Sequence, residues 1–230
     1  MTNIKKKNIS DFFQDEDNGY LGYARYVVES RALPSIIDGL KPGARKILHA
    51  ALKTLKGEQK YLKLVGATYE HSLYHHGDTS IQGTITTLSQ HYSDNLAPLT
   101  IIGAAPELRA PGTASPRYLE VKLSPYAKLY RQDERILEYK IEDGQSIDPK
   151  YYLPLIPLVL TKRTSGMGLG YAYNSSISYN PLDVVDGCLA HITNKKLPKL
   201  RPYIKEYTGI FEENSEDDRI WAEARWAHKG

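Results

Sequence analysis

Apolar side chains recur every three or four residues in the first part of the chain, which is the spacing of an amphipathic helix. The clearest run begins at Pro42, which suits the first turn of a helix, and is predicted to stop at Gly57. Its apolar stripe consists of Ala44, Ile47, Leu48, Ala51 and Leu55. Further helices are expected over 20–33, over 61–73 and from Asp78, which is a suitable N-cap.

The pattern changes beyond a segment rich in glycine, proline and alanine, residues 94–114, which is expected to be a loop. After it, apolar and polar residues alternate from Tyr118 onward, as they do in a half-buried strand. The alternation directs Leu119, Val121 and Leu123 toward the core and leaves Tyr118 on the polar face. Because three helices followed by a strand and a loop form the layout of a winged helix-turn-helix, the sequence predicts an α+β fold.

Composition divides the chain into three parts. Residues 1–19 are polar and charged and are expected to form a flexible arm, whereas residues 20–145 hold the predicted winged-helix domain. Residues 146–230 differ, with an apolar stretch interrupted by prolines and then a glycine-rich turn at 165–170. Asn180, followed by a proline, starts a further predicted helix in this second domain.

The distribution of charge is more informative than its total, because the formal net charge is only +3. Between Tyr23 and Gly66, nine lysines and arginines stand against three acidic residues. One face of the helix predicted from Pro42 carries Arg45, His49, Lys53 and Lys56. This stripe is either a site for a polyanion or an ordinary solvated helix face, and the pattern alone leaves both interpretations open.

The rest of the composition excludes some classes of protein. A single cysteine, Cys188, allows no disulfide within the chain, which fits a reducing cytosol. The sequence has no apolar run of about 18 residues, the length that a membrane-spanning helix needs. Residues 1–7 lack the apolar stretch of a signal peptide. We therefore expect a cytoplasmic protein that has no membrane partner.

Tyr118 is the first candidate for chemistry, because it is placed on a polar strand face beside Arg117. A phenol can attack a phosphodiester, and since the product is again a phosphodiester, the exchange is reversible without an energy input. A neighbouring arginine could neutralise charge on the phosphate oxygens in the transition state. The alternative is an ordinary surface tyrosine in a chain that has 18 tyrosines.

Two adjacent histidines, His75 and His76, are the second candidate, because they precede the helix predicted from Asp78. The free N–H groups and the dipole of a helix N-terminus attract phosphate, and histidines there could donate to it or move a proton. The alternative is a pair of loop histidines with structural partners. No spaced set of His, Cys, Asp or Glu completes a ligand shell around them, so no metal site is predicted.

The order of several motifs resembles the DNA breakage–reunion region of type IIA DNA topoisomerases. These motifs are Arg31-Ala32-Leu33-Pro34, Asp38-Gly39-Leu40-Lys41-Pro42, Tyr74-His75-His76-Gly77-Asp78, Ala114-Ser115-Pro116-Arg117-Tyr118, Tyr152 to Leu160, Ser165 to Gly170, and Pro202 to Gly209. The adjacent histidines and the Ser-Pro before Arg-Tyr resemble the T-even-phage and eukaryotic branch. The resemblance implies a winged-helix (CAP-like) DNA-gate domain over 20–145 and the start of a tower domain over 146–230, truncated before the coiled-coil gate.

The resemblance also implies roles for single residues. Tyr118 is implied as the nucleophile that forms a 5′-phosphotyrosyl link, Arg117 as the residue that stabilises the phosphate, and His76 as the catalytic histidine. The implied DNA contacts are Arg31, Lys41, Arg45, Lys46 and His75. Met167 is similar to the family's apolar residue that wedges between base pairs and bends the duplex.

The implied activity is DNA cleavage and religation for double-strand passage by an ATP-dependent type II topoisomerase. Mg²⁺ is expected on the toprim module of a partner subunit, with ATP on the partner's ATPase. Two copies are expected to form a homodimer across the DNA gate, and a separate chain could carry the rest of the tower and the coiled coil. The alternative is a truncated, non-catalytic module that binds and bends double-stranded DNA. Either would act in the cytoplasm, that of the host if a phage encodes the chain.

Overall fold

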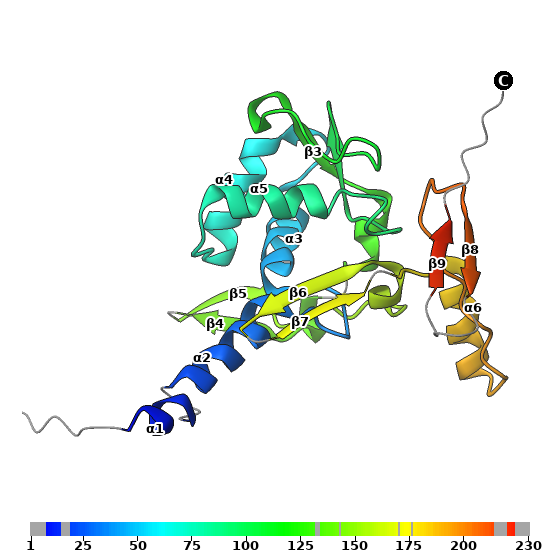
Figure 1. The fold of residues 1–230 in the computed structure, drawn as a ribbon. Helices are drawn as coiled ribbons and strands as arrows, with labels where there is room; N and C mark the ends of the chain where they lie inside the picture. Colours follow the sequence, from blue (N-terminus) through cyan, green and yellow to red (C-terminus); the bar gives the residue numbers. More distant parts are fainter. Residues whose placement is uncertain are drawn as a thin grey trace, which may run out of the picture.

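The computed structural model describes residues 8–14, 19–131, 134–142, 144–169, 171–175, 177–213 and 220–223 (Figure 1). The helices are α1 (Ile9–Gln14), α2 (Tyr20–Val27), α3 (Pro42–Thr54), α4 (Tyr61–Ser72), α5 (Asp78–Thr87) and α6 (Pro181–Ile192). Short segments with π geometry (η1) or 3₁₀ geometry (the others) are η1 (Val28–Ala32), η2 (Pro116–Tyr118), η3 (Pro125–Leu129), η4 (Glu134–Ile136) and η5 (Leu158–Thr161). The strands are β1 (Gln59–Lys60), β2 (Leu99–Ile102), β3 (Glu120–Leu123), β4 (Tyr139–Glu142), β5 (Gln145–Pro149), β6 (Thr164–Gly168), β7 (Tyr171–Ser175), β8 (Ile210–Glu213) and β9 (Ile220–Glu223).

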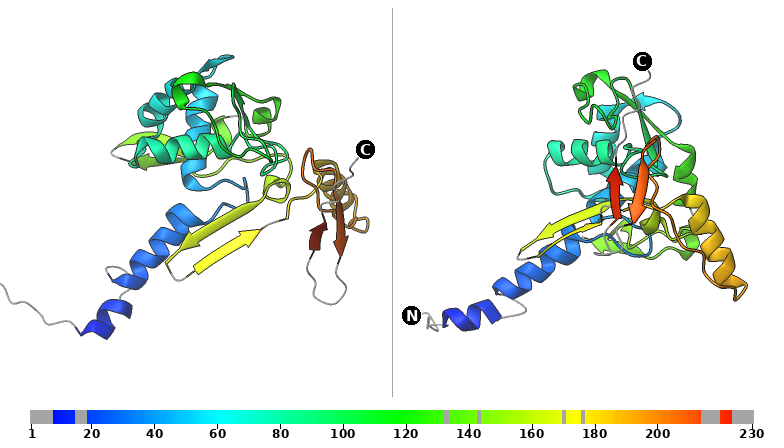
Figure 2. Two further views of the ribbon diagram at one scale, coloured as in Figure 1. Left: turned by 45° about the horizontal axis from the view of Figure 1, so that its top comes forward. Right: turned by 45° about the vertical axis from the view of Figure 1, so that its right-hand side comes forward.

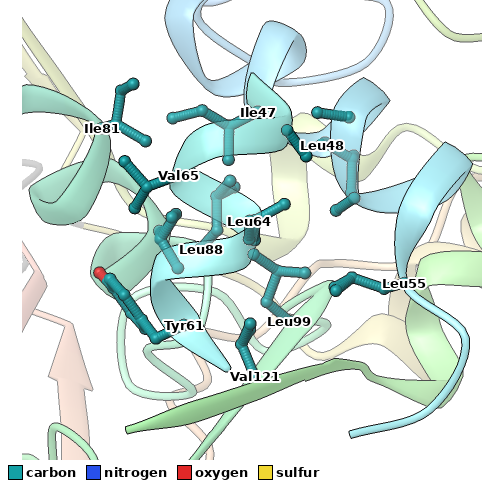
Figure 3. Close-up of a cluster of buried hydrophobic side chains, with 14 of the residues drawn as sticks. Ile47, Leu48, Leu55, Tyr61, Leu64, Val65, Ile81, Leu88, Leu99 and Val121 are labelled. Carbon is teal, nitrogen blue, oxygen red and sulfur yellow. The ribbon is translucent and has the colours of Figure 1, made fainter. Parts of the chain in front are cut away.

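The core lies between α3, α4, α5 and a small antiparallel sheet with the order β1-β3-β2 (Figure 3). The apolar stripes of the helices face inward, so that Ile47 of α3, Leu64 of α4 and Ile81 of α5 are fully buried. In the sheet Val121 pairs with Ile101, and both side chains close the core from the other side. Apolar burial of this kind is the main contribution to stability. The predicted α+β fold is confirmed.

The segment around Tyr118 differs from the predicted strand. Strand β3 begins only at Glu120, and Tyr118 belongs to η2. Pro116 at the start of η2 explains the difference, because its ring fixes φ and removes the N–H that strand pairing needs. The predicted alternation still holds where the strand forms, since Leu119 and Val121 are buried.

Two segments that were predicted to be a loop and a turn each contain a β-strand. Residues 94–114 were expected to be a loop, but β2 lies within them and pairs along its whole length with β3. Residues 165–170 were expected to be a glycine-rich turn, but 164–168 form β6, which pairs with β7. In both cases pairing with a second segment decides the conformation, which local composition does not reveal.

The first and last described elements, α1 and β9, lie on opposite sides of the core (Figures 1 and 2). Residues 9–14, expected to be part of a flexible arm, form α1, which together with α2 projects to one side. The parts of that arm at 1–7 and 15–18 lie outside the described residues. On the other side are the β8–β9 pair and α6, which starts after Asn180 as predicted and whose first turn is capped by the Asn180 side chain. None of the helices in the described part of the chain is long and apolar enough to cross a membrane.

Candidate functional site

A groove of about 810 Å³ opens between η1, the beginning of α3, α5 and β6. Arg31 of η1 and Lys41 at the N-cap of α3 supply positive charge to one wall, and Arg163 just before β6 supplies it to the other. Burial lowers the pKa of Lys41 from its ordinary value. The groove therefore collects cationic side chains from segments that are distant in the sequence, as a site for a polyanion requires.

Helix α5 presents hydroxyl groups rather than charges to this groove. Ser80, Thr84 and Thr87 follow one another at helical spacing and line it. The hydroxyls of Thr84 and Thr87 donate to backbone carbonyls one turn earlier in the helix, so both side chains are held in place. The sequence prediction did not identify this face, although the spacing of the three residues was the signal that could have revealed it.

His76 lines the groove directly before α5, whereas His75, which is also exposed, is not among its lining residues. The buried ring of Tyr74 contacts the His76 ring edge to face, with the centroids 5.4 Å apart. The N-cap position of α5 is occupied by Gly77, not by Asp78 as predicted, and Asp78 is the first residue of the helix. The structure thus places His76 beside a helix N-terminus that can receive an anion.

Tyr118 is 73% exposed at the end of η2, so its hydroxyl is accessible from solvent. The guanidinium carbon of Arg117 lies 5.9 Å from the centroid of the Tyr118 ring. The neighbouring Leu119 is buried and anchors this segment to the core. Tyr118 and Arg117 are not among the residues that line the groove with His76. The structure therefore brings the predicted nucleophile and its arginine together, and the predicted histidine lines the groove.

The expectation that Arg45 lies on an exposed face for DNA contact is wrong, because only 3% of this residue is exposed. Its Nε lies 2.7 Å from Oδ2 of Asp38, and its Nη2 donates both to Oδ1 of Asp38 and to the carbonyl of Leu40 at 2.9 Å. Asp38 also accepts from the backbone N–H of Tyr152 at 2.9 Å. Arg45 is therefore a structural link between α3, the turn before it and the second half of the chain.

His49 shows why the helical spacing on α3 was misleading. It is buried, and its Nδ1 lies 3.3 Å from the hydroxyl of Tyr152. Burial, and next the charge of Lys53, lowers the pKa of His49 to about 4. Because the segment that contains Tyr152 covers this side of α3, the first half of the predicted basic stripe faces protein rather than solvent.

Lys46 is half-buried and is also engaged with the protein. Its ammonium donates to the carbonyl oxygens of Ser72 at 2.8 Å and of Leu73 at 3.3 Å. These carbonyls are at the C-terminus of α4, where a positive charge is favourable and the last carbonyls need donors. Lys46 thus holds α3 and α4 together, and its predicted contact with DNA stays a prediction.

Met167 is the next-to-last residue of β6, and 82% of it is exposed. The flanking glycines face the opposite way, toward η1. A Cβ atom on Gly166 would collide with the carbonyl oxygen of Ala32, and one on Gly168 would lie 2.6 Å from a methyl group of Val28. The glycines therefore let β6 lie directly on η1, and the alternation of a strand turns Met167 outward. Met167 is therefore not part of the core.

No group of three or more His, Cys, Asp or Glu side chains that could hold a metal ion is found among the residues that the structure describes. The described part of this chain therefore does not fit a bound catalytic metal by itself.

Comparisons with known proteins give a consistent result. The family model for the A subunit of DNA gyrase/topoisomerase IV matches residues 31–225. The chain is 38% identical over 189 residues to DNA topoisomerase 2 of Bombyx mori, which covers 79% of this chain and 12% of that protein. It is 37% identical over 221 residues to DNA topoisomerase 2 of Plasmodium falciparum, which covers 91% of this chain and 15% of that protein.

Similarity extends to a solved structure, the Plasmodium falciparum topoisomerase II DNA-binding, cleavage and re-ligation domain. The match has a TM-score of 0.79 at 34% sequence identity and covers 86% of this chain and 28% of that one. The chain thus spans a small part of the length of the relatives that it matches.

Proposed function

Because the chain belongs to the family of the DNA gyrase/topoisomerase IV A subunit, we propose that it is the DNA-cleaving part of a type II topoisomerase. The observation that carries this proposal is the exposed hydroxyl of Tyr118 beside Arg117. A phenol on the surface needs no conformational change to reach a phosphodiester, and its exposure leaves the hydroxyl available as a nucleophile.

In the proposed reaction the oxygen of Tyr118 attacks a backbone phosphorus of double-stranded DNA. A bond forms between the tyrosine oxygen and phosphorus while the bond from phosphorus to the 3′ oxygen breaks, and the phenol proton ends on that 3′ oxygen. The product is a 5′-phosphotyrosyl link and a free 3′-hydroxyl. Arg117 stabilises the charge on the phosphate oxygens during the exchange, and His76 donates to a phosphate oxygen or moves the proton.

The groove is the proposed binding site of the duplex, with Arg31, Lys41 and Arg163 near the phosphates. Mg²⁺ and ATP are proposed to bind to the toprim and ATPase modules of a partner subunit, so no step here goes through a metal held by this chain. Two copies of the chain are proposed to act as a dimer, each cutting one strand. The rest of the tower and the coiled coil are proposed to lie outside residues 1–230.

Incubation of the chain with a purified toprim-bearing partner, Mg²⁺ and labelled duplex tests the proposal. Covalent protein–DNA adducts are expected on a denaturing gel, because the phosphotyrosyl bond survives denaturation. The label is expected to return to intact duplex when Mg²⁺ is removed before denaturation, since the exchange is reversible. Binding without any adduct would favour the alternative, a module that binds and bends DNA without cutting it.

Met167→Ala is expected to reduce the bend in bound DNA more than it reduces affinity. An exposed, unbranched side chain on a hairpin beside the groove can enter the stack of base pairs, which costs a few kcal/mol per step and is repaid by the contacts of a bent duplex. Fluorescence energy transfer between the ends of a short duplex measures the bend at saturating protein.

Leu155→Ala provides the matched control for this experiment. Leu155 is also apolar and 85% exposed, but it lies outside the β6–β7 hairpin that carries Met167. The Leu155 variant should bend DNA like the unaltered chain. A Met167 variant with normal bending would show that this side chain does not act as a wedge.

A further inference from the structure

The ammonium group of Lys162 joins three segments of the chain at one buried point. Its Nζ lies 3.0 Å from Oδ2 of Asp94 and donates to the hydroxyl of Tyr130 at 2.7 Å. Asp94 belongs to the segment between α5 and β2, and Tyr130 caps η3, which follows β3. Lys162 itself precedes β6. Only 5% of Lys162 is exposed, and its two partners are buried as well.

The three groups form an ion pair with a neutral phenol. Burial alone would lower the pKa of Lys162, but Asp94 and Tyr130 outweigh burial and raise it above its ordinary value. Burial raises the pKa of Tyr130 to about 12 in spite of the neighbouring ammonium. At neutral pH the Lys162 ammonium is therefore charged and the Tyr130 phenol is neutral. Loss of either partner would leave an uncompensated charge inside the protein.

Backbone contacts concentrate at the same place. Lys162 and Asp94 form an isolated β-bridge. Two further hydrogen bonds flank it, from the N–H of Asn95 to the carbonyl of Thr161 at 3.1 Å and from the N–H of Arg163 to the carbonyl of Ser93 at 2.8 Å. The base of β6 is thus fastened to the segment that follows α5, and β6 and α5 form two walls of the groove.

The turn before α3 is shaped around this lysine. Gly39 has a φ of 66°, and a Cβ atom there would lie 2.9 Å from the Cα of Val159 and 3.2 Å from the Cε of Lys162. A side chain at this position would therefore displace the Lys162 stem or the backbone beside it. Lys162 and Asp94 are among the residues that line the groove, but only 5% of Lys162 and 6% of Asp94 are exposed, and their charged groups pair with each other. We therefore expect these charges to act on position rather than on a ligand.

We propose that Lys162 is a positioning residue that fixes the Met167 hairpin relative to α5 and to the Tyr118 segment. Through Asp94 it sets the spacing between the two groove walls, and through Tyr130 it connects the hairpin to the segment after β3. The distance between the bend at Met167 and the cleavage site at Tyr118 is thereby fixed along the bound duplex. This inference rests on the proposed function of Met167 and Tyr118.

The double variant Lys162→Met/Asp94→Asn tests the proposal, because it removes both charges and nearly preserves both shapes. It is expected to melt and to bind duplex close to the unaltered chain, since no unpaired charge remains. The bend in a duplex of about 30 base pairs, measured by fluorescence energy transfer at saturating protein, should decrease. Adducts formed with the toprim-bearing partner should fall by about 10- to 100-fold, because a small misplacement of reacting groups has effects of this size.

An exposed ion pair gives the matched control. Lys150 and Glu138 form a pair at 3.0 Å on the surface, and Lys150→Met/Glu138→Gln should leave bending and adduct yield unchanged. If the Lys162 double variant does not fold, Tyr130→Phe removes one hydrogen bond at the junction while keeping the ion pair, and it should reduce the bend in the same direction.

The results separate the inference from the proposed function. Normal bending and normal adduct yield in the Lys162 and Tyr130 variants would overturn the positioning role. So would a loss of thermal stability with an unchanged bend at saturation, because a purely structural pair produces that result. If the unaltered chain neither bends DNA nor forms adducts with its partner, the proposed function itself fails.

Discussion

Tyr118→Phe should reduce covalent protein–DNA adducts to background while duplex binding stays nearly unchanged. The phenol oxygen is the proposed nucleophile, and phenylalanine has no group that can replace it. Tyr118 is 73% exposed, so the substitution should change the free energy of unfolding by no more than about 0.5 kcal/mol. A denaturing gel with labelled duplex, the toprim-bearing partner and Mg²⁺ measures the adducts, and a native gel measures binding.

Tyr23→Phe is the control for this loss. Tyr23 is also an exposed tyrosine, on α2, and its variant should form adducts at the normal yield. Adducts that persist in the Tyr118 variant would assign the nucleophile to another residue. Loss of both adducts and duplex binding would instead indicate that Tyr118 has a binding role.

Arg45→Ala should lower the free energy of unfolding by about 3–5 kcal/mol, the cost of breaking a buried ion pair by removing one partner. The substitution leaves the carboxylate of Asp38 in the interior with only backbone donors. Since domains of this size are stabilised by about 5–15 kcal/mol, much of the protein should unfold at moderate temperature. Denaturation in urea, followed by circular dichroism, measures the change.

Two variants separate the ion pair from general effects on α3. Lys53→Ala changes an exposed cation on the same helix and should alter stability by no more than about 0.5 kcal/mol. Arg45→Met with Asp38→Asn removes both charges and should recover part of the lost stability. A stable Arg45→Ala variant with weakened, less salt-dependent DNA binding would restore the interpretation of Arg45 as a phosphate contact.

The sequence predicted the helices of the core and the Tyr118–Arg117 pair, because these depend on local patterns. Apolar spacing predicted α3, α4 and α5, which the structure contains, and the ordered motifs predicted site roles for Tyr118 and His76, which stay predictions. The prediction for Arg45 failed because helical spacing shows which residues share a face but not whether a distant segment covers that face. Asp38, seven residues earlier, was the available signal for a buried partner.

The groove walls were less predictable for a related reason. Gly166 and Gly168 were predicted to form a turn, although their alternation with Ser165 and Met167 also fits a strand that has no side chains on one face at these two glycines. Lys162 has no pattern in the sequence at all, because its partners come from segments that only the folded chain brings together. Tertiary contacts therefore decided what local sequence left open.

The direct contact of β6 with η1 connects the β6–β7 hairpin to the projecting helix α2. Helix α2 runs without a break into η1, and at Gly166 and Gly168 no side chain of β6 separates the strand from it. In the proposed complex, a force that the base pairs exert on Met167 would pass directly to η1 and to the adjoining α2, which is about 12 Å long at 1.5 Å per residue. The proposed DNA contact at Met167 and the projecting helix α2 therefore share one support, η1.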